Sequence, residues 1–539
     1  LEIEAESLTP NELIQALLRA PVDLLWNGGI GTYVKASAET HSDAGDKAND
    51  AVRVDASELR ARVVAEGGNL GVTQRARVEY ALAGGKINTD AIDNSGGVDC
   101  SDREVNIKIL LDAVVEEGDL TEKQRNELLA EMTDAVAALV LQDNYEQTET
   151  LSLAEANAAS MVDVHQRFLR FLETRRNLDR ELEALPGDEE IGERKRDHGG
   201  LVRPEIAVLL AYSKIDLNEA LLDSDVPEDP YLSAEFERYF PAPLPERFGA
   251  QMREHRLCRQ IIATQVVNNM LHGGGTTFAF RLHEETGAPA SQIARAYACA
   301  REIFEMRPLW AEIEALDCKC DAGVQTELLL EGRRLVERAS RWLLGNRPRQ
   351  LDIASTVRHF RPGATALYAS ITRLLAPEDA EPLARRADEL REQGVPEDLA
   401  TRVAALPIMF SAFDIVTVAD ETGLEVDHVG AVHFRLGNRL GLHWLRDRIV
   451  ALPRDNRWRA RARAALRDDL YAIHRELTSE VLRSAPPGGD PEQMVDGWIG
   501  SNPASERTLQ TLGDIRSGQS YDLTTLPVAV REIRNLIGG

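Results

Sequence analysis

Residues 63–105 read VVAEGGNLGVTQRARVEYALAGGKINTDAIDNSGGVDCSDREV, and this stretch decides the fold of the N-terminal part of the chain. The short apolar runs at 63–65 and 87–92 predict strands, and the segment 73–82 between them predicts a helix. The first strand runs into Glu66-Gly67-Gly68-Asn69, and the second into Asp93-Asn94-Ser95-Gly96-Gly97. Strands that alternate with helices indicate a parallel α/β sheet, in which ligands bind beyond the carboxyl ends of the strands.

The same alternation extends toward the N-terminus. Thr9-Pro10-Asn11-Glu12 places a proline at the first helical position and a glutamate three residues after a capping threonine, which predicts a helix over 10–20. The apolar run 22–26 predicts a buried strand that ends at Asn27-Gly28-Gly29. Residues 35–56 are polar and predict a loop or a partial helix. Three predicted strand ends therefore carry an asparagine beside small residues.

These strand ends supply the candidate cofactor-binding residues. Glycine lets a flat cofactor approach the backbone, and a carboxamide side chain donates and accepts hydrogen bonds at once, which suits the amide of a nicotinamide. Asparagine and glycine are also common in ordinary turns, so each position keeps a purely structural alternative. The candidates are Asn27, Gly28, Gly29, Asn69, Asn94 and Gly96.

No G-x-G-x-x-G motif follows any of the predicted strands. The nearest approach, Gly28-Gly29-Ile30-Gly31, lacks the third glycine and has no predicted helix behind it. A nucleotide-binding domain needs that turn to hold the pyrophosphate at a helix N-terminus. We therefore expect the second half of a Rossmann-like domain, with the phosphate-binding half upstream of Leu1.

Several stretches resemble the glutamate dehydrogenases, and more closely the large NAD-specific bacterial branch of that family. The resemblance covers most of the chain and is densest before Leu111. It is carried by PVDLLWNGGIGTYVKAS (21–37), VVAEGGNLGVTQ (63–74) and NTDAIDNSGGVDCSDREVNIKILL (88–111). The further stretches LVRPEIAVLLAYSKI (201–215) and HRLCRQIIATQVVNNM (255–270) are similar to a C-terminal region found only in the large branch.

The resemblance implies a reaction and residue roles. The implied reaction is oxidative deamination of L-glutamate to 2-oxoglutarate and ammonia, with hydride transfer to NAD. It implies that Asn94 contacts nicotinamide or substrate and that Ser101 lies near the distal carboxylate of the substrate. Ser101-Asp102-Arg103-Glu104 also has the pattern of a capping box, so Ser101 is equally well explained as a helix cap.

The resemblance assigns the catalytic lysines and aspartate to an upstream substrate domain. Lys35, Lys86 and Lys108 match none of the family's lysine motifs, so we assign no catalytic residue to this chain and expect it to be inactive alone. Two alternatives stay open: a non-catalytic helical module for regulation or oligomerisation, and a dehydrogenase for another amino acid. Ser95 and Asp102-Arg103 depart from the small enzymes and leave the substrate selectivity open.

Beyond residue 101 the hydrophobic period becomes helical. We expect an α/β part followed by an all-α part, divided into the half nucleotide-binding domain (1–110), helices that pack back on the catalytic core (111–190) and a helical C-terminal domain (191–539). The charged segment 186–200 is the best candidate for a linker. Residues 415–418 and 430–434 could form short strands, but helices are the favoured prediction.

Composition restricts the partners of the chain. A formal net charge of −27 over 539 residues disfavours nucleic acid and anionic membranes. No run of about 18 apolar residues could span a bilayer, and five scattered cysteines suggest reduced thiols without a zinc site. We expect a fragment, beginning at Leu1, of a cytoplasmic bacterial protein that forms a homo-oligomer and binds no metal.

Overall fold

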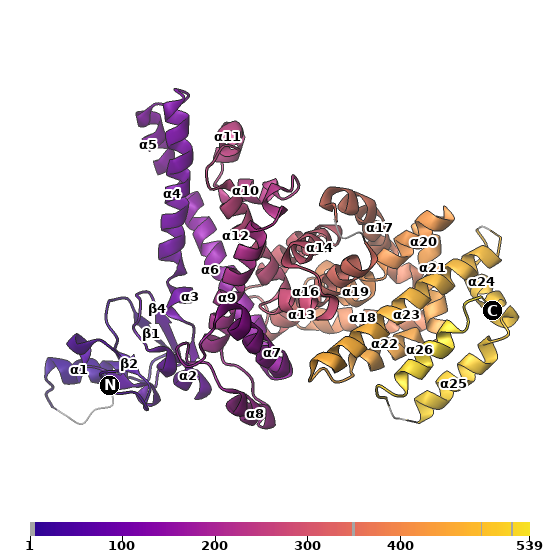
Figure 1. The fold of residues 1–539 in the computed structure, drawn as a ribbon, viewed down its shortest axis with the longest axis horizontal. Coiled ribbons are helices and arrows are strands. Elements are labelled where there is room, and N and C mark those ends of the chain that lie inside the picture. Colours follow the sequence, from indigo (N-terminus) through magenta and orange to yellow (C-terminus); the bar gives the residue numbers. More distant parts are fainter. Residues whose placement is uncertain (1–5, 348–350, 487, 519–520, 539) are drawn as a thin grey trace. The chain divides into compact units, whose positions relative to one another are not determined.

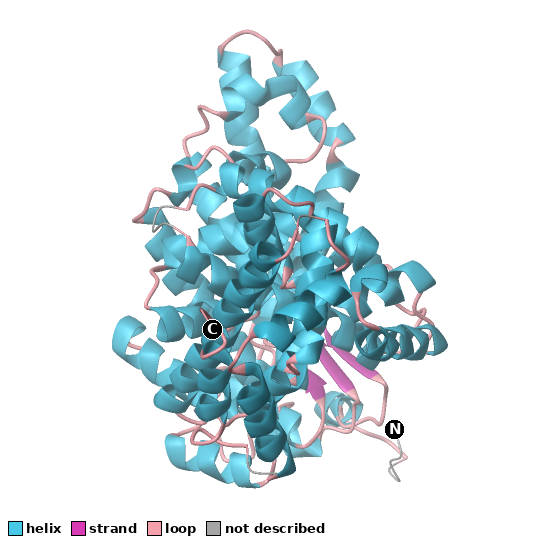
Figure 2. Cartoon of the chain, turned by 90° about the vertical axis from the view of Figure 1, so that its right-hand side faces the viewer, coloured by secondary structure: helices cyan, strands magenta, loops and turns pink. Residues whose placement is uncertain are grey.

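The structure is a computed structural model that describes residues 6–347, 351–486, 488–518 and 521–538. The chain divides into two compact units, Leu1–Phe278 and Ala279–Gly539. The first unit holds all the strands of the described residues, and the second is helical. Figure 2 shows how small the share of strand is beside the helices. The expected domain boundaries near residues 110 and 190 stay predictions.

The first unit contains a parallel sheet of three strands in the order β1-β4-β5. Strand β1 (Leu24–Asn27) pairs with β4 (Val63–Glu66), and β4 pairs with β5 (Lys86–Ile87). The register sets Asn27 opposite Glu66, so the carboxyl ends of β1 and β4 coincide. A second parallel pair joins β2 (Val34–Lys35) to β3 (Val54–Asp55). The prediction of parallel strands is confirmed. A helix over 74–82 separates β4 from β5 as expected, whereas only short strands and 3₁₀ turns lie between β1 and β4.

The third strand is much shorter than the sequence predicts. β5 ends at Ile87, and residues 90–93 form the short helix α3 (Asp90–Asp93). Thr89 is extended at the N-cap position, and the acidic side chains of Asp90 and Asp93 lie in the first turn, which suits the positive end of a helix. The prediction of a strand over 87–92 is therefore wrong beyond Ile87, because the polar residues 88–90 interrupt the apolar run and the acidic residues favour a helix N-terminus.

Helix starts at the N-terminus follow the sequence closely. Thr9 and Glu12 form the predicted capping box of α1 (Pro10–Leu18). Thr73 accepts a hydrogen bond from the backbone N–H of Ala76 and caps α2 (Gln74–Leu82). Three 3₁₀ turns and further helices complete the unit: η1 (Lys47–Asn49), η2 (Ala56–Glu58), α4 (Ser95–Glu116), α5 (Glu122–Glu131), α6 (Thr133–Ala156), α7 (Ala158–Arg176), α8 (Asp188–Arg196), α9 (Arg203–Leu222), η3 (Val226–Glu228), α10 (Ser233–Tyr239), α11 (Leu244–Met252) and α12 (Cys258–Gly274).

The sheet is buried on the side that faces α2. Val64, Ala76, Tyr80 and Ile87 belong to one apolar cluster, and the Tyr80 hydroxyl donates to the Ala61 carbonyl at 2.6 Å. Past the sheet, α4 leads away from the strands, α5 lies at its far end, and α6 returns alongside it (Figure 1). This hairpin of helices starts directly behind the loop that carries Asn94.

The segment expected to be a linker, 186–200, contains helix α8. Arg194 on this helix forms an ion pair with the buried carboxylate of Glu205 at 2.7 Å. Glu205 lies in the first turn of α9, and its side chain also accepts the Val202 N–H. The charges that suggested a solvated linker therefore hold α8 against α9.

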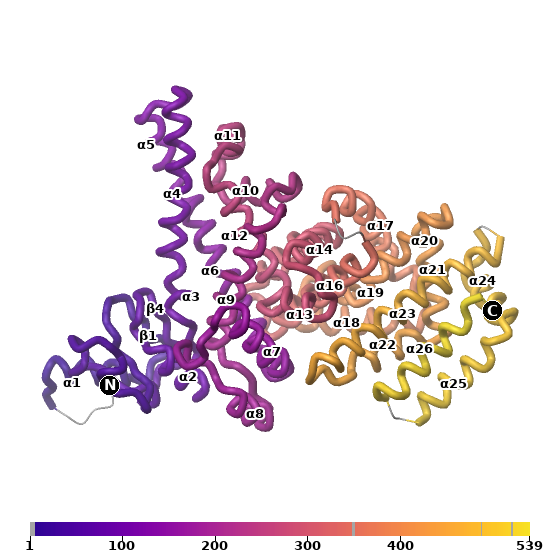
Figure 3. Tube along the Cα trace, in the orientation of Figure 1, coloured from indigo at the N-terminus to yellow at the C-terminus, as the bar shows by residue number. Residues whose placement is uncertain are grey.

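The second unit consists of helices, with a 25-residue helix α16 and a 28-residue helix α23 as its longest members. Residues 415–418 and 430–434 lie in α20 and α21, so the favoured helical prediction is confirmed. Helices α22, α23 and α26 run side by side (Figure 3). The helices are α13 (Phe278–Thr286), which begins at the boundary, α14 (Ala290–Ile303), α15 (Met306–Glu314), α16 (Ala322–Asn346), α17 (Ile353–Leu374), α18 (Pro377–Glu392), α19 (Glu397–Met409), α20 (Ala412–Thr422), α21 (Val426–Arg439), α22 (Leu442–Val450), α23 (Arg457–Ser484), α24 (Pro491–Ser501), α25 (Ser505–Ser517) and α26 (Leu526–Arg534).

Within the described residues no single helix is long and apolar enough to cross a membrane. The bent pair α19 and α20 meets the criteria of length and composition when its two helices are taken together. Most of the apolar side chains of this pair are buried inside the second unit.

Candidate functional site

The loop after β4 meets Asn94, the single residue between α3 and α4, at the carboxyl edge of the sheet. The Asn94 Nδ2 donates a hydrogen bond to the Asn69 Oδ1 at 2.7 Å. Asn69 is exposed and Asn94 is half-buried, so the pair lies at the surface. The two asparagines that the sequence singles out are thus in direct contact, and each keeps amide capacity for a ligand.

Asn27 lies beneath the loop after β4. Its carbonyl oxygen accepts the N–H groups of Gly67 at 2.9 Å and Gly68 at 3.2 Å. Its side-chain Oδ1 is 3.5 Å from the N–H of Gly29, whereas its buried Nδ2 has no hydrogen-bond partner in the described part of the chain. Because a buried donor without a partner costs about 1–3 kcal/mol, this amide is a candidate ligand contact.

Two glycines of the β4 loop are required by close packing. A Cβ at Gly71 would lie 1.6 Å from the Asn27 Nδ2, and one at Gly68 would lie 2.6 Å from the Gly29 carbonyl oxygen. By contrast, a Cβ at Gly29 would meet nothing within 4 Å, and one at Gly96 would make only an ordinary contact with Val140 at 3.6 Å. Space beside Gly29 is therefore open, and packing explains Gly68 and Gly71 without a ligand.

A buried ion pair supports the β4 loop from below. The guanidinium of Arg77 contacts the fully buried carboxylate of Glu66, with 2.7 Å between Nε and Oε2. The Oε1 of Glu66 accepts the Val72 N–H at 3.1 Å, and Asp90 accepts the Leu70 N–H at 2.8 Å. Burial raises the pKa of Glu66, and Arg77 opposes that rise. Both ends of the loop are thereby fixed.

Asp93 ties β4 to the segment that carries Asn94. Its carboxylate accepts the Glu66 N–H at 3.0 Å and the Asn88 Nδ2 at 2.6 Å. Burial raises the pKa of Asp93, and these hydrogen bonds counteract it. Asn94 follows directly and therefore takes its position from this carboxylate.

The sequence predictions do not include the charged residues that hold the β4 loop and Asn94 in place: Glu66, Arg77, Asp90 and Asp93. The pair of Glu66 and Arg77 has a signal in the sequence. A carboxylate at the end of a buried strand needs a cation, and α2 carries Arg77 within one helical turn of its start. Asp90 binds the backbone N–H of Leu70 and Asp93 binds that of Glu66, and these partners could not be predicted from the sequence.

Ser101 is not a helix cap. Helix α4 begins at Ser95, so Ser101 lies in its second turn, exposed to solvent. Its hydroxyl donates to the Gly97 carbonyl at 3.2 Å, an ordinary contact of a serine inside a helix. The capping-box prediction is wrong because α4 starts one and a half turns earlier, and the cap position belongs to Asn94, whose side chain bonds Asn69 instead.

Two of the three lysines compared with the family's motifs have carboxylate partners. Lys35 pairs with Asp55, and Lys108 pairs with Glu104 on the same helix. Neither lysine stands at the edge formed by Asn69 and Asn94. The edge itself presents amides, backbone N–H groups and small residues, which can orient a planar polar ligand but cannot take up a proton at neutral pH.

This combination defines a class: a small parallel α/β element with a polar edge at the carboxyl ends of its strands, joined to a large helical region. Comparison with known families makes the assignment specific. The chain belongs to the glutamate dehydrogenase family. Residues 198–535 match the family described as glutamate dehydrogenase, C-terminal, and residues 1–154 match the bacterial NAD-glutamate dehydrogenase catalytic domain.

Three curated relatives carry the name NAD-specific glutamate dehydrogenase. The proteins of Pseudomonas aeruginosa, Halomonas elongata and Mycobacterium tuberculosis are 48%, 45% and 43% identical to this chain, in that order. Each alignment covers 99% of this chain and 33% of the relative. The chain therefore spans about a third of the length of the curated relatives that it matches.

Proposed function

We propose that this chain supplies one wall of the active site of an NAD-dependent L-glutamate dehydrogenase of bacterial cytoplasm. The reaction is oxidative deamination of L-glutamate to 2-oxoglutarate and ammonia. The observation that carries the proposal is the contact between Asn94 and Asn69 at the carboxyl edge of a parallel sheet. The name shared by the three relatives, NAD-specific glutamate dehydrogenase, supports the same reaction.

The β1-β4-β5 sheet is proposed to be the second half of a Rossmann-like domain within residues 1–110. Its parallel order and the shared carboxyl ends of β1 and β4 support this assignment, because dinucleotides bind at such edges. Residues 111–190 are proposed to pack back on the catalytic core, and residues 191–539 form the helical C-terminal domain.

The residues at this edge fit a nicotinamide. NAD, when bound, supplies the hydride acceptor of the reaction. The amides of Asn69 and Asn94 can hydrogen-bond its carboxamide, and the unpaired Asn27 Nδ2 can donate to a ribose or amide oxygen. A further set is proposed to approach the cofactor through the backbone: Gly28, Gly29 and Gly96.

Ser101 is proposed to contact the distal carboxylate of glutamate. The exposed position of Ser101 in the second turn of α4 supports this role, since nothing but the Gly97 carbonyl engages its hydroxyl among the described residues. The acid–base group and the cations that hold the substrate are assigned outside this chain. Alone, the chain is therefore inactive, and the active protein is proposed to be a homo-oligomer.

The test is NAD binding by the intact protein with Asn69→Ala and Asn94→Ala. Each loss of a ligand hydrogen bond of about 1 kcal/mol weakens NAD binding roughly fivefold to tenfold. Asn126→Ala, on the exposed face of α5, is the matched control and leaves the affinity unchanged. Unchanged affinity in both site variants would favour a helical regulatory or oligomerisation module instead.

A second arm tests the substrate. Turnover of L-glutamate is expected to exceed that of leucine and phenylalanine by orders of magnitude in the intact protein. A preference for the apolar amino acids would keep the cofactor assignment and overturn the glutamate assignment. NADH formation from glutamate by residues 1–539 alone would overturn the assignment of the catalytic groups to other parts of the protein.

A further inference from the structure

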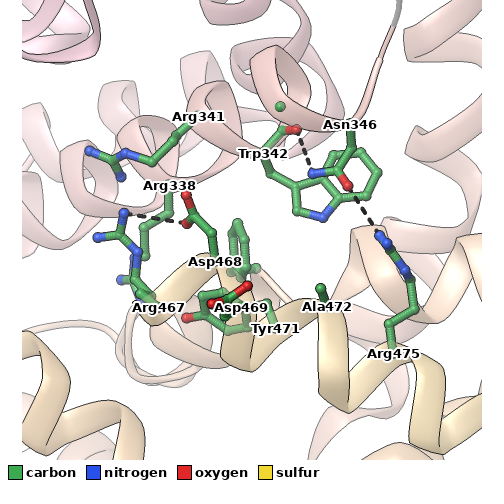
Figure 4. Close-up of a pocket in the computed structure, with 12 residues that line it drawn as sticks. Arg338, Arg341, Trp342, Asn346, Arg467, Asp468, Asp469, Tyr471, Ala472 and Arg475 are labelled. Carbon is green, nitrogen blue, oxygen red and sulfur yellow. Dashed lines mark hydrogen bonds and ion pairs between the residues drawn. The ribbon is translucent and has the colours of Figure 1, made fainter. Parts of the chain in front are cut away.

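The second unit contains a cavity of about 250 Å³ between α16 and α23. Figure 4 shows the side chains of Arg338, Arg341 and Trp342 from α16 facing those of Arg467 and Asp468 from α23. The lining residues are Arg338, Arg341, Trp342, Gly345, Asn346, Phe410, Arg467, Asp468, Asp469, Tyr471, Ala472 and Arg475. Four of them are arginines and two are aspartates, so the wall carries excess positive charge.

Two of these arginines are neutralised by carboxylates. Arg341 contacts Glu285 and lies 2.8 Å from Glu337, and these acids raise the pKa of its guanidinium. Arg475 lies 3.3 Å from the buried carboxylate of Asp414. Burial raises the pKa of Asp414 to about 6, which Arg475 opposes. Both arginines therefore have a structural explanation.

Arg467 has no such explanation. Only 8% of its surface is exposed, and its Nη2 has no hydrogen-bond partner in the described part of the chain. Oδ1 of Asp468 is 3.6 Å from this nitrogen, so the two side chains form a long ion pair without a hydrogen bond at this atom (Figure 4). Burial and the neighbouring charge of Arg341 lower the pKa of Arg467. Its guanidinium is thus a buried cation that is poorly compensated.

Arg338 adds a second, half-buried cation to the same cavity. Its Nε and Nη1 donate to the backbone carbonyls of Arg334 at 3.1 Å and Pro407 at 3.4 Å, and no described carboxylate lies within ion-pair distance. Burial lowers the pKa of Arg338, and Arg446 and Arg467 lower it further. Two lining cations, Arg338 and Arg467, therefore repel each other in this part of the cavity.

Nearby acids do not cancel this charge. Asp469 is engaged by Arg534 at 2.8 Å. Asp468 forms the ion pair with Arg467, but 56% of its side chain is exposed, so solvent screens this pair and it compensates the buried guanidinium only in part. An uncompensated buried charge destabilises a folded protein by several kcal/mol, and a bound anion removes that cost. Two arginines without full charge compensation in one cavity are typical of an anion-binding site.

We propose that this cavity binds a small organic oxyanion, a phosphate monoester or a carboxylate, through the guanidinium groups of Arg338 and Arg467. A guanidinium matches the oxygens of either group in a bidentate arrangement. The rings of Trp342, Phe410 and Tyr471 take the apolar part of the ligand; those of Phe410 and Tyr471 lie 4.5 Å apart. The site lies in the second unit and is independent of the proposed dehydrogenase activity.

The test is calorimetric binding of phenyl phosphate, benzoate and inorganic phosphate to the full chain at low ionic strength. One ligand per chain is expected, with phenyl phosphate or benzoate tighter than inorganic phosphate because of the aromatic wall. The tighter of the two organic probes distinguishes a phosphate site from a carboxylate site. Arg338→Gln and Arg467→Gln are expected to weaken binding tenfold or more. Arg459→Gln, an exposed residue of α23 that pairs with Asp455, is the control and binds normally.

A stability measurement separates a ligand site from a structural role. If Arg467 serves a ligand, Arg467→Met leaves the thermal midpoint of the free chain unchanged or raises it, while ligand binding is lost. If Arg467 is structural, the midpoint falls. Absence of saturable binding for all three probes, or unaltered binding in both glutamine variants, would overturn the proposal.

Discussion

The side-chain amide of Asn94 donates to the side-chain oxygen of Asn69 at 2.7 Å and joins the α3–α4 junction to the β4 loop, 25 residues earlier in the chain. Each of these two segments is fixed from below by a different carboxylate. Glu66 holds the Val72 N–H of the β4 loop, and Asp93 precedes Asn94 at the junction. The positions of Asn69 and Asn94 therefore depend on the buried carboxylates of Glu66 and Asp93.

The hydrogen bond between Asn69 and Asn94 should be measurable as a coupling energy. Asn69→Ala, Asn94→Ala and the double variant form a thermodynamic cycle, and we expect a coupling of about 0.5–1.5 kcal/mol in the free energy of unfolding. Urea titration of the ligand-free chain provides the measurement. Strict additivity of the two single effects would contradict a direct bond.

Removal of Arg77 should destabilise the first unit strongly. Arg77→Ala leaves the buried Glu66 carboxylate without its cation, and such a change costs about 3–5 kcal/mol. The measurement is the unfolding midpoint in urea, followed by a signal from the first unit. Arg75→Ala on the same helix, at an exposed position, is the control and should cost less than about 1 kcal/mol. Equal effects of the two changes would argue against the buried pair.

Gly71 should not tolerate a methyl group, whereas Gly29 should. The added Cβ at Gly71 would overlap the Asn27 amide, so Gly71→Ala should cost about 1–3 kcal/mol and displace Asn27. Gly29→Ala meets open space and should be near neutral for stability. Thermal unfolding of the two variants, compared side by side, checks the difference.

Acid should destabilise the second unit through two stacked histidines. The rings of His433 and His474 lie 3.6 Å apart, and both are buried. Burial lowers the pKa of His433 well below its usual value and lowers that of His474 to about 3. The nearby His443 and Arg446 lower the pKa of His474 further, whereas the bond from its ring to the His433 carbonyl opposes this.

The lowered pKa values of His433 and His474 make the free energy of unfolding decrease in acid. Unfolded histidines take up protons near pH 6.5, while the folded rings stay neutral, so the stability is full above that pH and falls as the pH decreases toward the folded pKa. Each ring should cost about 2 kcal/mol between pH 7 and pH 5. Urea midpoints across this range provide the measurement, and His474→Gln should flatten the dependence. His198→Gln, in an exposed loop, should leave it unchanged.

Ser101 should affect substrate but not stability. Its hydroxyl bonds the carbonyl of Gly97 inside α4, so Ser101→Ala should change the free energy of unfolding by less than about 0.5 kcal/mol. In the intact protein the same change should raise KM for glutamate. A loss of stability of about 1 kcal/mol or more would restore the capping interpretation.

Local chemistry explains what could be predicted. Thr9 and Thr73 begin their helices as expected, because a cap and its partner lie within three residues of each other. Two predictions from local patterns are wrong because another local pattern competes with each. Residues 90–93 form helix α3 and not the end of a strand, and α4 begins at Ser95, ahead of the capping pattern at Ser101.

Hydrophobic period and turn residues act over short distances, so the amino-acid sequence is enough to predict the parallel strands, the helical second unit and the asparagines that end or follow β1 and β4. The third predicted strand end, at Asn94, is instead the junction between α3 and α4. Three contacts are visible only in the folded chain: Asn94 bonds Asn69, Arg77 neutralises Glu66, and Arg338 and Arg467 line one cavity. The physical reason is that a buried polar group must find its partner across the packed interior, and packing of distant elements selects that partner.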